Sequence, residues 1–235
     1  MDKTIIKSPR LYTDQDLNSG LSIELDGGQA HYLKNVLRKN VGGVLRLFNG
    51  RDGEWIGTIE NLSKRSAFVS LSEQLRLQSV ANRRVHIFFP PIKKTRMDFL
   101  IEKAVELGAT DLHPVLTQNT ETRKINEERV QMQIIEAAEQ CERLDIPTLY
   151  DLCDFKDAIA QTNIETICAI ERCDAVDIKD LKSGDKDIAF LAGPEGGFTK
   201  EEHLYLLDQK NCSAVSLGSN ILRSETAFLK FLSII

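Results

Sequence analysis

The stretch AFLAGPEGGFTKEEH, residues 189–203, has the pattern of a strand, a glycine turn and a capped helix. An apolar run comes first, and Thr199 stands directly before a charged helical stretch. Between them, Gly193, Gly196 and Gly197 allow backbone N–H groups to approach a ligand closely. The spacing does not match G-x-G-x-x-G, and no Lys-Ser/Thr follows for a nucleoside triphosphate. The stretch is either a binding loop of a different kind or a tight turn with glycines for geometry alone.

A second loop of this type follows in LGSNILRSETAFLKF, residues 217–231. A strand ends at Gly218, and the polar loop after it carries Ile221 and Leu222 before Ser224, which is a natural helix cap. Apolar side chains beside free backbone amides and carbonyls suit an adenine ring. The alternative is a hydrophobic staple on the last helix. Two such loops after neighbouring strands favour one shared ligand site.

Around these loops, apolar strands alternate with amphipathic helices at short spacing. Such alternation predicts an α/β domain with a parallel sheet. The predicted strands lie within residues 83–92, 111–118, 164–173, 187–193 and 213–218, and the predicted helices within 95–109, 126–144, 199–210 and 224–235.

The first part of the chain follows a different pattern. Residues 42–62 and 66–77 alternate apolar and polar side chains, with turn signals at Asn49-Gly50 and Asp52-Gly53. A short amphipathic helix precedes them within residues 30–40. This pattern predicts a small β module of the barrel type. We therefore divide the chain into residues 1–75 and 76–235.

Charge and composition limit the partners, the cellular location and the metal sites that we expect. The net charge of −5 argues against a general nucleic-acid binder. The first 80 residues, however, hold 11 Lys or Arg against 9 Asp or Glu, so an RNA contact is expected to be local. No apolar run is long enough for a membrane span and no signal peptide is recognisable, which favours a cytoplasmic protein. The five cysteines form no C-x-x-C and the four histidines have no ligand spacing, so we expect reduced thiols and no metal.

Both loops carry a resemblance to a known family. GPEGGFTKEE and LGSNILRSETA, with KKTRMDFLIEKAVELGA and EAAEQCER upstream, resemble the bacterial ribosomal-RNA methyltransferase family RsmE. HYLKNVLRKNVGGVLRLFNGRDGEW resembles the N-terminal module of that family. The similarity covers nearly the whole chain. One departure is Asn220, where the family pattern has an arginine.

The resemblance implies methylation of N3 of a uridine in small-subunit (16S) ribosomal RNA, on the assembled subunit, with S-adenosylmethionine. It implies a homodimer, a PUA-like RNA-binding β-barrel in residues 1–75 and a SPOUT domain with a C-terminal trefoil knot in residues 76–235. The two loops would be the crossing segments of the knot, with the cofactor between them. A ligand without a phosphate then explains the missing lysine. The implied cofactor-binding residues are Leu191, Ala192, Gly193, Pro194, Gly196, Gly197, Leu217, Gly218, Ile221 and Leu222.

Uracil N3 carries a proton that must leave before methyl transfer, so the site needs charge stabilisation and a possible base. Arg223 could stabilise the uridine anion, or form a salt bridge with Glu225. Glu195 could be a base, or a backbone hydrogen-bond partner. No histidine lies in a motif, and His203 is expected on a solvated helix face.

The candidate RNA-binding residues are cations. Lys93, Lys94 and Arg96 stand within four positions at the end of a predicted strand, where a phosphate contact competes with a plain solvated turn. Arg38 and Arg10 lie in the N-terminal module, and Arg10 matches an arginine in the family pattern. Two other classes stay open, a Rossmann-type nucleotide enzyme and a non-enzymatic RNA-binding protein.

Overall fold

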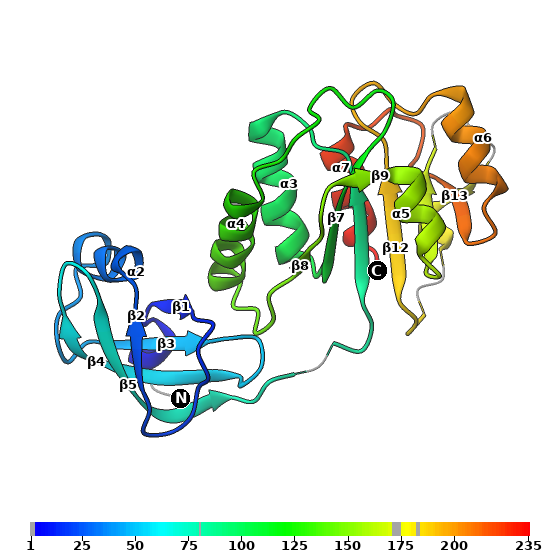
Figure 1. The fold of residues 1–235 in the computed structure, drawn as a ribbon. Helices are drawn as coiled ribbons and strands as arrows, with labels where there is room; N and C mark the ends of the chain where they lie inside the picture. The colour runs from blue at the N-terminus through cyan, green and yellow to red at the C-terminus, as the bar shows by residue number, and fades with distance from the viewer. Residues whose placement is uncertain (1–2, 80, 171–174, 182–183) are drawn as a thin grey trace. The chain divides into compact units, whose positions relative to one another are not determined.

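The computed structural model describes residues 3–79, 81–170, 175–181 and 184–235. The chain forms two compact units, which Figure 1 shows as a smaller and a larger body. The first consists of Met1–Val80 with Ala138–Ile146, and the second of Ala81–Ala137 with Pro147–Ile235. Nothing in the sequence pattern indicates that Ala138–Ile146, from the middle of the chain, belongs to the first unit.

The first unit is built on a five-stranded sheet of order β1-β3-β4-β5-β2. Strands β1 and β3 pair in parallel, and the other pairs are antiparallel. Its elements are α1 (Lys3–Ile6), β1 (Arg10–Tyr12), β2 (Ser22–Leu25), α2 (Gly27–His31), the π-helical turn η1 (Tyr32–Val36), β3 (Val44–Phe48), β4 (Glu54–Leu62) and β5 (Ala67–Arg76).

The turn predicted at Asn49-Gly50 and Asp52-Gly53 is present and joins the antiparallel strands β3 and β4. The Asn49 side chain accepts from the backbone N–H groups of Arg51 and Asp52 and donates to the Asp52 carboxylate, and Gly50 and Gly53 have positive φ angles of 81° and 76°. These contacts close the turn by local hydrogen bonding.

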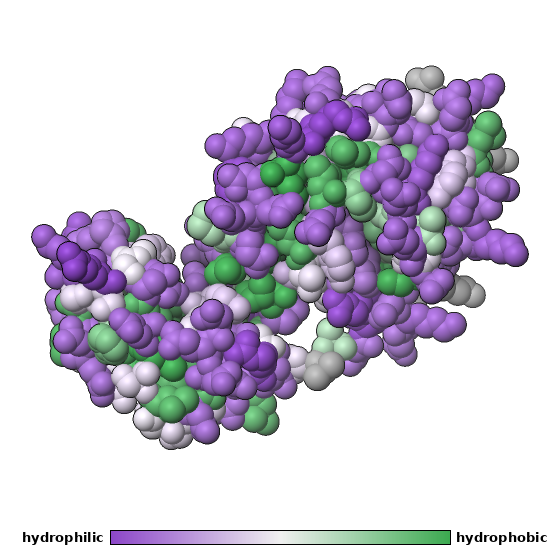
Figure 2. Space-filling model, viewed as in Figure 1, coloured by the Kyte–Doolittle hydropathy of each residue, from purple (hydrophilic) through white to green (hydrophobic). Residues whose placement is uncertain are grey.

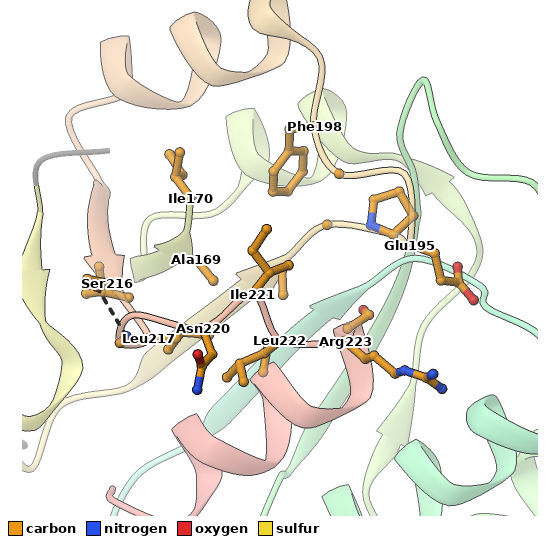
Figure 3. A pocket seen from close by; sticks show the side chains of 18 of the residues that line it. Ala169, Ile170, Glu195, Phe198, Ser216, Leu217, Asn220, Ile221, Leu222 and Arg223 are labelled. Carbon is orange, nitrogen blue, oxygen red and sulfur yellow. Dashed lines mark hydrogen bonds between the residues drawn. The ribbon is translucent and has the colours of Figure 1, made fainter. Parts of the chain in front are cut away.

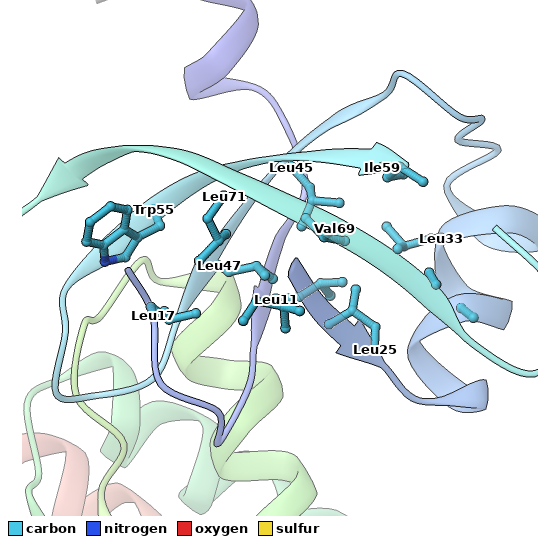
Figure 4. Close-up of a cluster of buried hydrophobic side chains, with 13 residues drawn as sticks. Leu11, Leu17, Leu25, Leu33, Leu45, Leu47, Trp55, Ile59, Val69 and Leu71 are labelled. Carbon is cyan, nitrogen blue, oxygen red and sulfur yellow. The ribbon is translucent and has the colours of Figure 1, made fainter. Parts of the chain in front are cut away.

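Alternate side chains of the strands fill an apolar core in this unit (Figure 4). Leu11, Leu25, Leu45, Leu47 and Val69 are 3% exposed or less, and Trp55 is 9% exposed. Trp55 is the single tryptophan of the chain, so its fluorescence reports on the first unit alone.

The second unit confirms the predicted parallel α/β domain. Its sheet has the order β11-β13-β10-β12-β6-β7-β8, with β9 paired to β7, and every pair is parallel. The elements are β6 (Val85–Phe89), α3 (Lys94–Glu106), β7 (Asp111–Leu116), α4 (Glu127–Gln140), β8 (Thr148–Leu149), β9 (Cys153–Asp154), α5 (Phe155–Gln161), β10 (Glu165–Ala169), β11 (Val176–Asp177), the 3-10 turn η2 (Ile178–Asp180), β12 (Ile188–Ala192), α6 (Lys200–Asp208), β13 (Cys212–Ser216) and α7 (Ser224–Leu232).

Strand β12 shows how the sheet is covered on both faces. Leu191 packs into a cluster with Phe155 of α5 and Leu206 of α6. Phe190 points the other way and stacks on Phe231 of α7, with ring centroids 4.4 Å apart. Because successive side chains of a strand face opposite sides, α5 and α6 cover one face and α7 covers the other. Helix α3 packs beside α7.

Some elements of the structure are absent from the sequence prediction. Helix α5 and the short strands β1, β2, β8, β9 and β11 have no counterpart in the sequence prediction. Residues 171–173 of the predicted strand 164–173, and with them Cys173, lie outside the described residues. The other four cysteines are free thiols.

The surface in the view of Figure 2 is mostly hydrophilic, with apolar side chains gathered over part of the larger unit. Phe99 of α3 and Met132 of α4 are exposed at 43% and 63%. Among the described residues, no helix has both the length and the apolar character that crossing a bilayer requires.

Candidate active site

The glycine loop follows β12, and contacts within the loop and at the start of α6 fix its conformation. Gly197 has a φ of +66° and its N–H donates to the Pro194 carbonyl at 2.9 Å. A Cβ at Gly193 would lie 3.3 Å from the Phe198 ring, so a side chain at this position would crowd the loop. The predicted cap is confirmed, because Thr199 accepts from the Glu202 backbone N–H at 3.2 Å.

Glu202 joins this loop to the segment after β7. Its carboxylate accepts from the backbone N–H of Thr199 and of Gln118, each at 2.7 Å, and the residue is 4% exposed. The neighbouring Asn119 side chain donates to the carbonyls of Gly196 and Gly197, each at 3.0 Å. The glycine loop is therefore held by hydrogen bonds from a second connection.

The second loop follows β13. Gly218 has a φ of +101°, and Lys230 of α7 donates to the Leu217 carbonyl at 2.6 Å. Helix α7 begins at Ser224 with Arg223 as its cap residue, so the prediction that Ser224 caps this helix is wrong. Ile221 is 66% exposed and lines the cavity described next, which places it outside the core.

The two loops line one cavity of about 650 Å³. In Figure 3, Ile221 lies in the middle, Glu195 and Arg223 toward one end, and Ser216 and Leu217 toward the other. Of the implied cofactor residues, Ala192, Gly193, Pro194, Gly196, Gly197, Leu217, Gly218, Ile221 and Leu222 line it. Leu191 does not, because its side chain faces the core between the sheet and α5.

Ten lining residues are absent from the predicted site, and four of them lie before β13 in the chain. Ala169 is the last residue of β10 and Ile170 follows it. Strand β10 lies between β12 and β13 in the sheet, so the strand order alone brings both residues to the cavity. Phe198 stands inside the glycine motif, and His203 follows it in the first turns of α6. The expectation that His203 lies on a solvated face is wrong, since it is half-buried with its ring 6.0 Å from that of Phe198.

One end of the cavity is charged. Arg96 lies with its Nη1 3.5 Å from Glu195 Oε1 and its Nε 3.8 Å from Glu225 Oε1. The salt bridge between Arg223 and Glu225, the alternative role given above for Arg223, is not formed. Within the described part of the chain, Arg223 has no ion pair. Arg96, Glu195 and Arg223 line the cavity, and Glu225 lies behind them with an exposed fraction of 8%.

The candidate RNA-binding cations differ in accessibility. Lys93, Lys94 and Arg38 are exposed. Arg10 is 6% exposed, with its Nε 2.6 Å from Glu54 Oε1 and its guanidinium carbon 3.4 Å from the centroid of the Phe48 ring. It also donates to the Ala138 and Arg143 carbonyls. A guanidinium held in this way is structural, and we withdraw Arg10 from the RNA-binding set.

The described residues contain one group with possible metal ligands, His86, Asp111 and His113, which adjacent strands bring together. Asp111 accepts four hydrogen bonds, from two nitrogens of Arg84, from Thr110 and from Tyr150, which occupy its four lone-pair positions. His86 Nδ1 and His113 Nε2 lie 3.0 Å apart and are hydrogen-bonded to each other, whereas His86 Nε2 is 3.7 Å from Asp111 Oδ2 and has no hydrogen-bond partner among the residues described. We therefore assign this group to the packing between β6 and β7.

The comparisons with known proteins agree with one another. The chain matches a family model described as an RNA methyltransferase domain over residues 79–235, and one described as an RNA methyltransferase PUA domain over residues 25–72. It is 36% identical over 226 residues to the ribosomal RNA small subunit methyltransferase E of Rickettsia conorii, covering 94% of this chain and 92% of that protein. The protein of that name from Neisseria gonorrhoeae, solved bound to S-adenosylmethionine, superposes with a TM-score of 0.86 at 28% identity, covering 96% of this chain and 95% of that one. A Legionella pneumophila protein in complex with the same cofactor gives a TM-score of 0.88 at 28% identity, with coverage of 97% and 96%.

Proposed function

The chain belongs to the ribosomal RNA small subunit methyltransferase E family, and we propose that it methylates N3 of a uridine in 16S ribosomal RNA with S-adenosylmethionine. The observation that carries this proposal is the single cavity lined by the loops after β12 and β13. Related proteins solved with that cofactor share the fold over nearly their whole length.

The residues at the cavity fit this cofactor. Apolar side chains of Leu217, Ile221 and Ile170 offer a surface for an adenine ring, and the free backbone groups of the loops can read its edge. A Cβ at Gly193 would be only 3.3 Å from the Phe198 ring, which explains why glycine stands there. The missing phosphate-binding lysine agrees with a ligand that has no phosphate. When bound, the cofactor supplies an electrophilic methyl group on a sulfonium.

The protein side of the reaction is electrostatic. Uridine N3 is a nucleophile only after its proton has left, and the resulting negative charge spreads over N3 and the two neighbouring carbonyl oxygens. Arg223, exposed at the rim of the cavity, is placed to donate to such an oxygen. Glu195 is the accessible carboxylate at the same end and the candidate proton acceptor.

We propose that the chain between β12 and α7 forms a trefoil knot, as in other SPOUT proteins. Support comes from the sheet order, in which β10 separates β12 from β13 while α7, after β13, packs back against β12. We propose likewise that the five-stranded sheet of the first unit closes as a PUA-like barrel, in line with the PUA family match.

RNA binding is assigned to exposed cations of each unit, Arg38 in the first and Lys93 and Lys94 in the second. We propose a homodimer, supported by the exposed apolar side chains of Phe99 in α3 and Met132 in α4, and a cytoplasmic location, where the small subunit is assembled. Sedimentation velocity would measure the dimer.

The test is transfer of a labelled methyl group to small ribosomal subunits that lack the modification, followed by nucleoside mass analysis. We expect one labelled 3-methyluridine per subunit, and label in another nucleoside would refute the proposed position. Subunit binding without transfer would leave an RNA-binding protein. Free 16S RNA as a parallel substrate distinguishes naked RNA from the assembled particle.

A further inference from the structure

The Arg96 side chain is more buried than a phosphate-binding side chain would be. Lys93 and Lys94, which precede it, are exposed to solvent, as phosphate-binding side chains are. The Arg96 side chain is only 31% exposed, lines the cavity, and lies between the carboxylates of Glu195 and Glu225. Its position is that of a group directed at the ligand site.

Three connections between strands and helices bring these charges together. Arg96 follows β6 in the first turn of α3, Glu195 follows β12, and Arg223 and Glu225 follow β13 at the start of α7. The carboxyl ends of parallel strands meet at one edge of a sheet, and α3 packs beside α7. The result is two guanidinium groups and the Glu195 carboxylate at one end of the cavity, with the buried Glu225 behind them.

This cluster is not saturated. The distances from Arg96 to the carboxylate oxygens, 3.5 and 3.8 Å, exceed the roughly 2.7–2.9 Å of a tight charge-assisted hydrogen bond. Ser224 Oγ and Glu225 Oε2 are buried, and neither has a hydrogen-bond partner. Buried polar groups in native proteins are nearly always paired, and the exceptions concentrate where a ligand or water completes them. The cluster therefore keeps hydrogen-bonding capacity that its own side chains do not use.

We propose, on the basis of the proposed function, that Arg96 is a second catalytic arginine that donates to one carbonyl oxygen of the target uracil, with Glu225 as the residue that positions it. Uracil N3 lies between two carbonyl oxygens, and the cavity offers two guanidinium groups, Arg96 and Arg223. Donation to both oxygens stabilises the deprotonated base and leaves the N3 lone pair open in the plane of the ring. With the cofactor bound, the N3 proton would pass to the Glu195 carboxylate, the N3 lone pair would bond to the methyl carbon, and the electron pair of the broken C–S bond would stay on the leaving sulfur.

The carboxylates have a matching role. Two guanidinium groups alone would repel a positively charged sulfonium in the same cavity. Glu195 and Glu225 cancel that charge without removing the donors, so one end of the cavity can serve both a cationic donor and an anionic acceptor.

The test compares Arg96→Ala, Arg96→Lys and Glu225→Gln with the wild type on small subunits. Lys103→Ala is the control, because Lys103 lies in α3 and pairs only with Glu102 and Glu106 in the described residues. We expect kcat of Arg96→Ala to fall by about a hundredfold, the loss typical of one oxyanion donor, with KM for the subunit and Kd for the cofactor within about threefold. Arg96→Lys should recover part of the rate, and Glu225→Gln should lose part of it.

A second readout excludes a merely structural role. The pH–rate profile of Arg96→Ala should move to higher pH, because the bound uridine is harder to deprotonate. Subunits that contain 5-fluorouridine, whose N3 proton is more acidic, should restore much of the rate. A raised KM with unchanged kcat would make Arg96 a phosphate contact, and an unshifted profile without rescue would make it structural. A wild type that does not methylate uridine would remove the proposed function itself.

Discussion

At the scale of single residues, Arg10 and Arg51 show how burial decides what an arginine does. Arg10 pairs with Glu54, whose side chain is fully buried, and two further arginines, Arg46 and Arg76, lie within 3.6 and 2.7 Å of that carboxylate. Burial lowers the pKa of Arg10, and Glu54 opposes that shift. Arg51 pairs at 3.0 Å with Asp16, and both side chains are more than half exposed.

Arg10→Met should therefore destabilise the first unit by about 3 kcal/mol, because Glu54 loses its closest cation and the Ala138 and Arg143 carbonyls lose a donor. Arg51→Met, the matched control, should cost about 0.5 kcal/mol or less. Urea unfolding followed by Trp55 fluorescence measures both. Equal effects of the two variants would contradict the structural role of Arg10.

Gly196 has a second requirement besides its backbone freedom. A Cβ there would lie 3.0 Å from Asn119 Cβ, against a side chain that donates to the Gly196 carbonyl. Gly196→Val should raise the Kd for S-adenosylmethionine at least tenfold, about 1.4 kcal/mol, by displacing the loop. Gly184→Ala, where nothing lies within 4 Å of the added carbon, is the control for calorimetry. Unchanged affinity in Gly196→Val would separate this loop from cofactor binding.

At the scale of elements, one carboxylate joins two connections of the sheet. Glu202→Ala removes the acceptor of the Thr199 and Gln118 backbone N–H groups, whereas the neighbouring Glu201 is exposed. We expect Glu202→Ala to destabilise the second unit by about 2 kcal/mol and Glu201→Ala by about 0.5 kcal/mol or less. Hydrogen exchange should show faster opening of both segments in the first variant, and exchange confined to α6 would argue against the link.

Two histidines, His86 in β6 and His113 in β7, make the stability of the second unit sensitive to acid. Burial lowers the pKa of His113 to about 4 and also lowers the pKa of His86. The unfolded chain therefore binds more protons than the folded one below about pH 6.5, so stability falls as the pH is lowered from 6.5 toward 4. Replacing His113 by Phe, which keeps the stacking on Phe88 and Tyr150, should reduce that slope by about 1.4 kcal/mol per pH unit. An NMR titration midpoint of His113 near 6.5 would contradict this.

The elements also show what a sequence can predict here. The alternation of strands and helices, the capping residue Thr199 and the two glycine loops are local patterns, and the structure confirms them. Ala169 and Ile170 reach the cavity only through the strand order, which no local pattern contains. Arg10 is misjudged for the same reason, since its partner Glu54 and the Ala138 carbonyl are distant in the chain.

At the scale of the whole molecule, binding to the ribosomal subunit should depend on a few cations, because the net charge is −5. Changing Lys93 and Lys94 to Glu should weaken subunit binding and lower the slope of log K against log salt by about 2, one for each lost phosphate contact. Lys103→Glu serves as the control for a charge reversal in the same region of the chain. A slope identical to that of the wild type would remove both lysines from the interface.

Because the segment Ala138–Ile146 belongs to the first unit, part of that unit is synthesised long after the rest. The Arg10 guanidinium reaches the Ala138 carbonyl across 128 positions of the chain, and Arg46 reaches Glu142 across 96. During synthesis, the N-terminal strands leave the ribosome long before these partners exist. Until more than half of the protein has been translated, Arg10 and Arg46 can pair with Glu54 but lack these later partners. A nascent chain stopped at residue 80 should be protease-sensitive, and one extended past residue 146 should acquire protection.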